Sequence, residues 1–309
     1  MPGAAEHILP VLLIIAIGYA VRRIGLIDDA GRAAIERLTY YVLFPCLIFL
    51  SLATTDFAEF PALPAGVTLF AATIAMALVS LALRPVLAAR FKLDGPAFTS
   101  LFQGATRWNT FIGLAVAGSL YGSQGLALIS VAIVAIVPLG NLMSVLILAR
   151  HAAQASPTVS GIVMALLRNP FIWACAVGLA ANAADLLPPA PLETAIDLMG
   201  RGAVAVGLIA VGAGLNLAAL RRPAPILWAA AILKLAVMPV VGLPLAALFG
   251  VSGLALGVVV IALAVPTATN AYVLAREMNG DASLMAEIIT FQTAISMLTL
   301  PLWIALMAG

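Results

Sequence analysis

The sequence predicts an all-α polytopic membrane protein with ten transmembrane helices, arranged as a 5+5 inverted repeat with crossed broken helices, the fourth and the ninth. Three observations lead to this class. Of the 309 residues, 64% are hydrophobic and only 9% are charged, whereas a soluble domain has about 25% charged residues. Apolar runs long enough to cross a bilayer recur ten times along the chain. Among the connections between these runs, Arg and Lys occur only in every second one.

Each apolar run is close to the roughly 20 residues that a helix needs to cross the hydrocarbon core. The predicted spans are roughly 6–22, 32–53, 63–88, 97–120, 125–149, 160–182, 192–219, 224–249, 253–277 and 282–308. The first run lacks the basic start and the small-residue cleavage site of a signal peptide, so we expect it to remain as a membrane span.

The connections between the spans predict the direction of insertion. The odd-numbered connections all contain Arg or Lys, and the even-numbered ones, such as "YGSQG" and "FGVSG", contain neither. Basic loops are retained on the cytoplasmic side of a membrane. We therefore predict a multi-pass protein of the cell inner (plasma) membrane with both termini extracytoplasmic.

The midpoint of the chain indicates an internal repeat. The stretch "AAQASPTVSG" at this point is typical of a linker. Five spans precede it and five follow, and an odd number in each half makes the second half enter the membrane in the opposite sense. Pro10 and Gly18 in the first span have the same spacing as Pro170 and Gly178 in the sixth. The predicted five-helix repeats are residues 1–155 and 156–309.

Polar residues gather in the middle of the fourth and ninth spans. The ninth contains "AVPTATNAY", in which Pro266 removes a backbone donor and should open or kink the helix. The fourth contains "RWNTF" at a similar depth, without a proline. Backbone groups freed in hydrocarbon are costly unless protein or water satisfies them. A simple kink would explain one such cluster, but two clusters in oppositely directed spans are typical of a transporter binding site.

Four stretches resemble the auxin efflux carrier family, the bacterial relatives of plant PIN proteins, whose fold is similar to that of bile-acid/sodium symporters. They are "YYVLFPCLIFLSLA", "LLRNPFIWACAVGL", "ILKLAVMPVVGLPLAALFG" and "AVPTATNAYVLAREMNGDASLMAEIITFQTAISMLTLPLW". The resemblance covers essentially all ten spans. One departure lies in the fourth span, where the family often has an Asn–Gly–Pro-like crossover and this chain has "RWNTFIG".

The resemblance implies a division into a scaffold and a transport domain. The scaffold would be residues 1–55 and 160–220, and the transport domain residues 63–150 and 223–309. The fourth and ninth helices would cross at their breaks, and an elevator-type movement would expose the crossing to each side of the membrane. The implied substrates are small organic anions, either dicarboxylates or auxin-like carboxylates, and the implied assembly is a homodimer through the scaffold.

The candidate substrate site is formed by the residues of the two interruptions. Arg107 is the sharpest candidate, because an arginine inside a membrane needs a partner. It could bind a substrate carboxylate through two hydrogen bonds, or form an ion pair with Glu287 or Asp197. Trp108 and Phe111 could stack on an aromatic ligand, but aromatic residues in a membrane helix more often serve in packing, which is the role expected here. The predicted substrate-binding residues are Arg107, Asn109, Thr110, Pro266, Thr267, Thr269, Asn270 and Tyr272.

Three other polar residues lie inside predicted spans and are candidates for coupling or for ion pairs. Glu287 and Gln292 in the tenth span could carry a coupling proton or help to hold a cation. The alternative for Glu287 is pairing with Lys234 or Arg107. Lys234 in the eighth span could pair with it or extend its ammonium group toward the membrane surface.

These features predict a secondary transporter, an efflux carrier or uniporter of small organic anions. No "GxxxxGK[ST]" loop for ATP is present in the sequence. A sodium- or proton-coupled organic-anion symporter of the bile-acid transporter type is the alternative. A membrane ligand sensor without net transport is the alternative of another class. We expect no enzyme activity, no cofactor, no metal site and no nucleic-acid partner. The expected partners are an organic anion, the lipid bilayer and a second copy of the chain.

Overall fold

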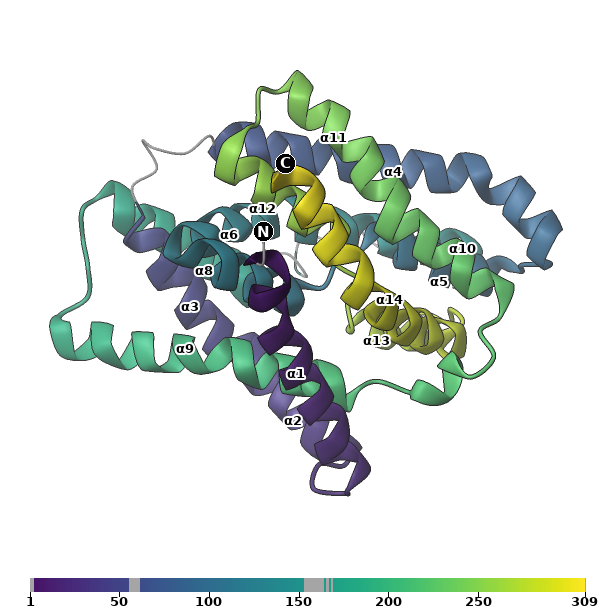
Figure 1. The fold of residues 1–309 in the computed structure, drawn as a ribbon, viewed down its shortest axis with the longest axis horizontal. Helices are drawn as coiled ribbons and strands as arrows, with labels where there is room; N and C mark the ends of the chain where they lie inside the picture. Colours follow the sequence, from purple (N-terminus) through teal and green to yellow (C-terminus); the bar gives the residue numbers. More distant parts are fainter. Residues whose placement is uncertain (1–2, 56–61, 153–163, 165–166, 168, 309) are drawn as a thin grey trace. The chain divides into compact units, whose positions relative to one another are not determined.

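The computed structural model describes residues 3–55, 62–152, 164, 167 and 169–308, and every regular element over these residues is helical (Figure 1). Most of the predicted midpoint linker lies outside this range. Six helical stretches are long and apolar enough to cross a membrane: Asp29–Ala53, Ala62–Phe91, Gly95–His151, Ala190–Ala213, Pro225–Leu248 and Ala282–Met307. The predicted class of an all-α, multi-pass membrane protein is confirmed, while the ten-span repeat stays a prediction.

The chain forms two compact units. The first consists of Met1–Leu63, Thr110–Val134 and Ala165–Leu215, and the second of Pro64–Asn109, Ala135–Met164 and Asn216–Gly309. The predicted scaffold and transport domain follow similar boundaries, except that Thr110–Val134 groups with the first unit. The division into a moving and a fixed part stays a prediction.

The first unit contains helices from each of its three segments. They are α1 (Gly3–Arg23), α2 (Asp29–Leu38), the π-helical turn η1 (Thr39–Leu43), α3 (Phe44–Ala53), the first part of α6 (Thr110–His151), α8 (Pro170–Ala183) and α9 (Ala190–Ala213). Helix α1 packs along α9, and α3 packs against α8 and α9 (Figure 1).

Glycines permit this close helix packing. Gly18 of α1 lies against the backbone of Ile209, and Gly212 of α9 lies against the backbone of Ile15. Any side chain at either glycine would overlap the partner helix. Small residues allow transmembrane helices to approach in this way, and the gain comes from van der Waals contact. The α1–α9 pair is therefore held by backbone-to-backbone packing.

The second unit is built around the last helix of the chain. Its helices are α4 (Ala62–Phe91), α5 (Gly95–Thr106), the second part of α6, the 3₁₀ turn η3 (Leu217–Leu220), α10 (Pro225–Ile232), the π-helical turn η4 (Leu233–Val237), α11 (Met238–Leu248), α12 (Gly253–Ala264), α13 (Ala271–Glu277) and α14 (Ala282–Ala308). Helix α14 packs against α5, α10, α12 and α13 (Figure 1). This central helix carries Gln292, which the site uses below.

Helix α6 runs through a break at Gly122, whose backbone is in the left-handed region with φ 58° and ψ −140°. A residue with a β-carbon rarely adopts this conformation, whereas glycine does so readily. The break falls within "YGSQG", the connection predicted between the fourth and fifth spans. The two predicted spans therefore form two separate helices that fold back on each other at Gly122, where Gly125 lies against the backbone of Ala117.

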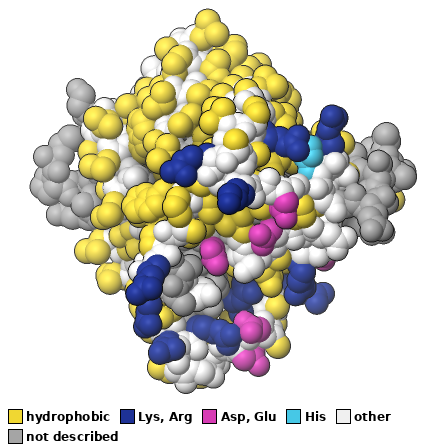
Figure 2. Space-filling view, turned by 90° about the vertical axis from the view of Figure 1, so that its right-hand side faces the viewer, with side chains coloured by type: hydrophobic (Ala, Val, Ile, Leu, Met, Phe, Trp, Pro, Cys, Tyr) yellow, Lys and Arg dark blue, Asp and Glu magenta, His cyan; other side chains and the backbone are white. Residues whose placement is uncertain are grey.

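Much of the surface is apolar. Large hydrophobic side chains such as Leu13, Leu78 and Leu298 are more than half exposed, and Figure 2 shows hydrophobic side chains over a large part of the face in view. In a soluble protein, such areas would mark interaction sites. Here they fit contact with lipid, because the helices that carry Leu78 and Leu298 are among the apolar stretches that can cross a membrane.

Candidate functional site

Two helices of the second unit end in the middle of predicted spans. Helix α5 ends at Thr106, residues 107–109 are not helical, and α6 begins at Thr110. Arg107 has extended backbone angles, φ −82° and ψ 162°. The chain therefore leaves the helix without a proline.

The second interruption follows α12, which ends at Ala264. Val265 is extended, with φ −66° and ψ 151°, as the ring of the following Pro266 requires. Helix α13 resumes only at Ala271. The expectation that Pro266 opens the helix agrees with these bounds, because a proline in the helix interior removes a hydrogen bond and clashes with the preceding turn.

The two non-helical segments satisfy each other's backbone groups. The backbone N–H of Asn109 donates to the carbonyl of Pro266 at 2.7 Å. The hydroxyl of Thr267 donates to the carbonyl of Gln103 at 3.1 Å. Asn109 and Pro266 lie outside the helices, so their backbone groups need such partners in hydrocarbon, whereas the carbonyl of Gln103 also accepts from the N–H of Arg107 at 3.0 Å. The interruption at 107–109 is thus stabilised by a tertiary contact in place of local turn chemistry.

The side-chain amide of Gln292 joins three segments at this point. Its Oε1 accepts a hydrogen bond from the backbone N–H of Thr267 at 3.0 Å, and its Nε2 donates to the carbonyls of Gly104 at 3.0 Å and Ala230 at 2.9 Å. Gln292 is fully buried. An amide group can donate and accept at once, whereas a carboxylate only accepts. The geometry therefore uses Gln292 to hold α5, α10 and the segment after α12 together.

Arg107 links the two interruptions with side-chain contacts. Its guanidinium donates to Gln103 Oε1 at 3.2 Å, Asn141 Oδ1 at 2.7 Å and Asn270 Oδ1 at 3.0 Å. All three acceptors are uncharged amide oxygens. The Arg107 residue is 6% exposed, and Asn270 is exposed. The guanidinium is thus oriented by neighbours from three segments, with an accessible asparagine beside it.

Two residues close to Arg107 in the sequence carry a buried hydrogen-bond donor that has no acceptor within the described part of the chain. The donors are Gln103 Nε2 and Trp108 Nε1, and their residues are 0% and 3% exposed. Buried donors are almost always paired, so each exception calls for an explanation. The burial of Trp108 agrees with the packing role expected for it, but its indole N–H remains available.

The other predicted substrate-binding residues are less closely joined. Thr110 is the half-buried first residue of α6 and belongs to the first unit. Thr269 is half-buried in the segment before α13. The ring of Tyr272 lies below the guanidinium of Arg276, 5.8 Å from the ring centroid. Phe111 stacks on Phe44 with centroids 4.8 Å apart, which is the packing role expected for it.

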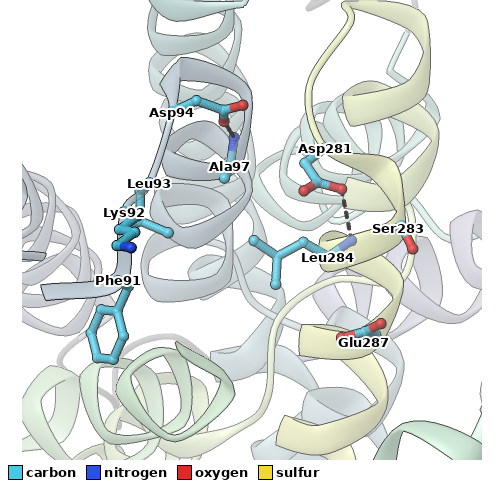
Figure 3. A pocket seen from close by; sticks show the side chains of 9 residues that line it. All are labelled: Phe91, Lys92, Leu93, Asp94, Ala97, Asp281, Ser283, Leu284 and Glu287. Carbon is cyan, nitrogen blue, oxygen red and sulfur yellow. Dashed lines mark hydrogen bonds between the residues drawn. The ribbon is translucent and has the colours of Figure 1, made fainter. Parts of the chain in front are cut away.

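The ion pairs considered for Glu287 are not formed. Among the described residues, this half-buried carboxylate makes no ion pair, and Lys234 donates to the carbonyl of Leu263 at 3.1 Å. Glu287 lines a pocket of about 360 Å³. In Figure 3, Asp94 and Asp281 lie on either side of this pocket, each bonded to a helix N-terminus through Ala97 and Leu284. Both aspartates therefore cap helix N-termini, and Glu287 lies further along α14 from its N-terminus.

Asp197 pairs with Arg201 one turn along α9, at 2.7 Å. This local pair explains the charges of the seventh predicted span as a feature of one helix face. No group of three or more His, Cys, Asp or Glu side chains that could hold a metal ion occurs among the residues described.

Sequence reasoning missed two residues that the structure brings to Arg107. Gln103 and Asn141 both contact the guanidinium. Their position inside apolar spans could have identified them, because an amide side chain there needs a hydrogen-bond partner just as a charged one does. Which partner it finds depends on how the helices pack, and the sequence does not state that.

Comparisons with known proteins match the chain to membrane transporters. Residues 4–304 match the profile of a family described as membrane transport protein. An uncharacterized transporter of Methanothermobacter thermautotrophicus is 26% identical over 306 residues, which cover 97% of each chain. An uncharacterized transporter of Methanocaldococcus jannaschii is 23% identical over 321 residues, which cover 96% of this chain and 97% of its own. The matches extend over both units.

Proposed function

We propose that this protein, which belongs to the membrane transport protein family of auxin efflux carrier-like proteins, is a secondary transporter of small organic anions. The family is one of transporters and not of enzymes. The observation that carries the proposal is the set of donors at the two interruptions. The oriented guanidinium of Arg107 is bonded to Gln103, whose buried Nε2 has no acceptor among the described residues, and the next residue in the chain, Trp108, carries a second such donor, its Nε1.

An anion would complete this cluster. A carboxylate has two oxygens that can accept several hydrogen bonds, and an arginine fork matches it in two parallel bonds. The neutral oxygens of Asn141 and Asn270 orient the fork but bring no negative charge to it. A substrate carboxylate would bind Arg107 and take the free N–H of Gln103, with Asn270 at the accessible edge. A cationic substrate would find mainly donors at this cluster.

The packing of the first unit supports the proposed 5+5 inverted repeat. Gly18 of the first repeat lies against α9 of the second, and Gly178 of the second lies against Phe49 and Leu52 of α3 in the first. An inverted repeat relates the first span to the sixth and the second to the seventh, so these two contacts would be equivalent. In the proposed ten-span protein, the fourth and ninth helices are broken and cross at the Arg107 cluster.

Transport would follow an elevator-type alternating-access mechanism. The residues of the cluster that are bonded to one another all belong to the second unit, which overlaps the proposed transport domain. A site carried by one compact unit can move with that unit. The proposed orientation, with both termini extracytoplasmic in the inner membrane, rests on the basic odd-numbered connections. The proposed homodimer through the scaffold rests on the family resemblance.

The experiment that tests the proposal combines binding with exchange. Purified protein is screened by thermal shift against malate and indole-3-acetate, and proteoliposomes are tested for counterflow of the labelled carboxylate that binds. Arg107→Ala should weaken binding by about 10- to 100-fold, because it removes charge-assisted bonds of roughly 1.5–3 kcal/mol. Arg107→Lys should also lose most of the affinity, since lysine lacks the planar fork.

Arg90→Ala is the matched control. Arg90 lies near the end of α4, with its guanidinium 5.6 Å from the ring centroid of Phe91, so its loss should leave the affinity unchanged. Wild-type affinity in both Arg107→Ala and Asn270→Ala would disprove the site. Saturable binding without counterflow would favour a sensor, and exchange that requires sodium would favour a coupled symporter.

A further inference from the structure

Lys234 is a buried lysine with an unusual partner. The residue is 0% exposed, and its Nζ donates to the backbone carbonyl of Leu263 at 3.1 Å. Within the described residues it forms no ion pair with a carboxylate. Because the side chain is fully enclosed, it does not extend to the membrane surface as the sequence allowed. The ammonium group is therefore held inside the second unit.

The partner carbonyl marks the carboxyl end of an interrupted helix. Helix α12 ends at Ala264, so the carbonyl of Leu263 has no N–H to accept from a further helical turn. The carbonyl of Ile261 is already taken by the N–H of Val265 at 3.0 Å. The carboxyl end of a helix carries a partial negative charge, and a cation there is stabilising. The ammonium group of Lys234 brings a positive charge to this buried helix end.

The segment that carries Lys234 is fixed on both sides. Lys234 lies in the π-helical turn η4, and wide turns of this type often occur at functional sites. The carbonyl of Ala230 before it accepts from Gln292 Nε2 at 2.9 Å, and the carbonyl of Leu235 after it accepts from Trp303 Nε1 at 2.7 Å. Both donors belong to α14. These bonds set the direction in which the lysine side chain leaves its helix.

A buried ammonium is costly, and its geometry must compensate. Methionine has a similar shape and would fill the same space without this cost, so packing alone does not account for a lysine. The contact with α12 does account for it, because the group satisfies a carbonyl and opposes the helix dipole at one position. Gln292 connects the same two regions, since it bonds both Ala230 and Thr267.

We propose that Lys234 is a tethered cation that holds the carboxyl end of α12 beside the interruption of the ninth predicted span. It does there what a bound metal ion would do in a cation-coupled carrier. The cycle of this protein therefore needs no dissolved sodium ion at that place. The statement about the cycle rests on the proposed transport function, whereas the statement about α12 does not.

Cation rescue of a cavity variant tests the proposal. Lys234→Ala removes the ammonium and leaves space beside the Leu263 carbonyl, which methylammonium can enter. In the purified protein without any carboxylate, methylammonium chloride should raise the Tm of Lys234→Ala by about 3 °C relative to tetramethylammonium chloride at equal ionic strength. Lys234→Met fills the space with an apolar group, so neither this variant nor the wild type should respond.

Two outcomes would overturn the proposal. One is a Tm of Lys234→Ala that is the same in both salts, or a response shared by all three proteins. The other is a wild-type Tm that rises in sodium chloride relative to choline chloride, since the tethered cation leaves no need for sodium. If Lys234→Ala gives no folded protein, Lys234→Ser is used with the same two salts and the same criteria. Because no carboxylate is present, failure here is separate from failure of the anion site, which Arg107→Ala reports.

Discussion

Each of the two units of this protein is stabilised internally by a different kind of contact. In the first unit, α1 and α9 approach through Gly18 and Gly212, and the contact is between backbones. In the second, side chains such as Gln292, Arg107 and Lys234 bond backbone or amide groups of distant segments. Glycine packing gives a rigid contact that needs no polar partner. A buried polar network costs more to build, but it keeps polar groups in the membrane interior, where the proposed anionic substrate would need them.

The largest expected effect is the loss of the Gln292 contacts. Gln292→Met removes three hydrogen bonds and takes the partner from the buried N–H of Thr267 and from the carbonyl of Gly104, while the carbonyl of Ala230 keeps the N–H of Leu233. We expect a destabilisation of about 2–5 kcal/mol, measured as a lower Tm, and loss of carboxylate binding. Gln292→Glu should also lower the Tm and abolish carboxylate binding, because a carboxylate does not donate to the carbonyls of Gly104 and Ala230.

Gln124→Met is the matched control for this prediction. Gln124 is exposed in the "YGSQG" stretch, so the same substitution there should leave the Tm unchanged. If Gln292→Met kept the wild-type Tm and affinity, the polar network would not be what holds the second unit. The distinction drawn between the two units would then be wrong.

The next effect concerns the glycine contact of the first unit. Gly18→Ala places a β-carbon against the backbone of Ile209, which cannot move as a side-chain tip would. We expect a loss of about 1–3 kcal/mol from overpacking, seen as a lower Tm. Gly202→Ala in α9 is the control, because a β-carbon there meets no atom within 4 Å. Equal Tm values for the two variants would show that α1 and α9 do not depend on close backbone contact.

The smallest effect is expected at the surface of the first unit. Asp197 and Arg201 form an ion pair at 2.7 Å, but the arginine side chain is 75% exposed. Exposed pairs one turn apart on a helix contribute little and are screened by salt. Asp197→Ala should leave the Tm and the carboxylate affinity within experimental error. A clear loss of binding in this variant would mean that charges of the first unit take part in substrate recognition.

Sequence reasoning located the helices well and their contacts poorly. The predicted spans 63–88 and 282–308 correspond to α4 and α14, and the ninth span was placed at 253–277, where α12 begins and α13 ends. The length of an apolar run and the Gly, Pro and charged residues that bound it are local properties, so they can be recognised directly in the sequence. The interruption at Pro266 was predicted for the same reason. No proline marks the break at 107–109, so only the polar residues of the fourth span predict it.

The partners of the polar residues required the folded protein. Arg107 was expected to bind substrate or a carboxylate, and the structure gives it Asn141 and Asn270, 34 and 163 residues away. Gln292 was considered for coupling, and its amide is engaged by three backbone groups. A role for Glu287 in coupling stays a prediction.

The sequence by itself determined that this protein is a multi-pass helical membrane protein, and where its apolar segments begin and end. The reason is that hydrocarbon forces each spanning segment to satisfy its own backbone. Only the tertiary structure decided what happens where that rule is broken. At 107–109 and 265–270 the backbone leaves the helix, and its polar groups take partners from Gln103, Pro266 and Gln292. Those partners are brought together by packing, which no local pattern encodes.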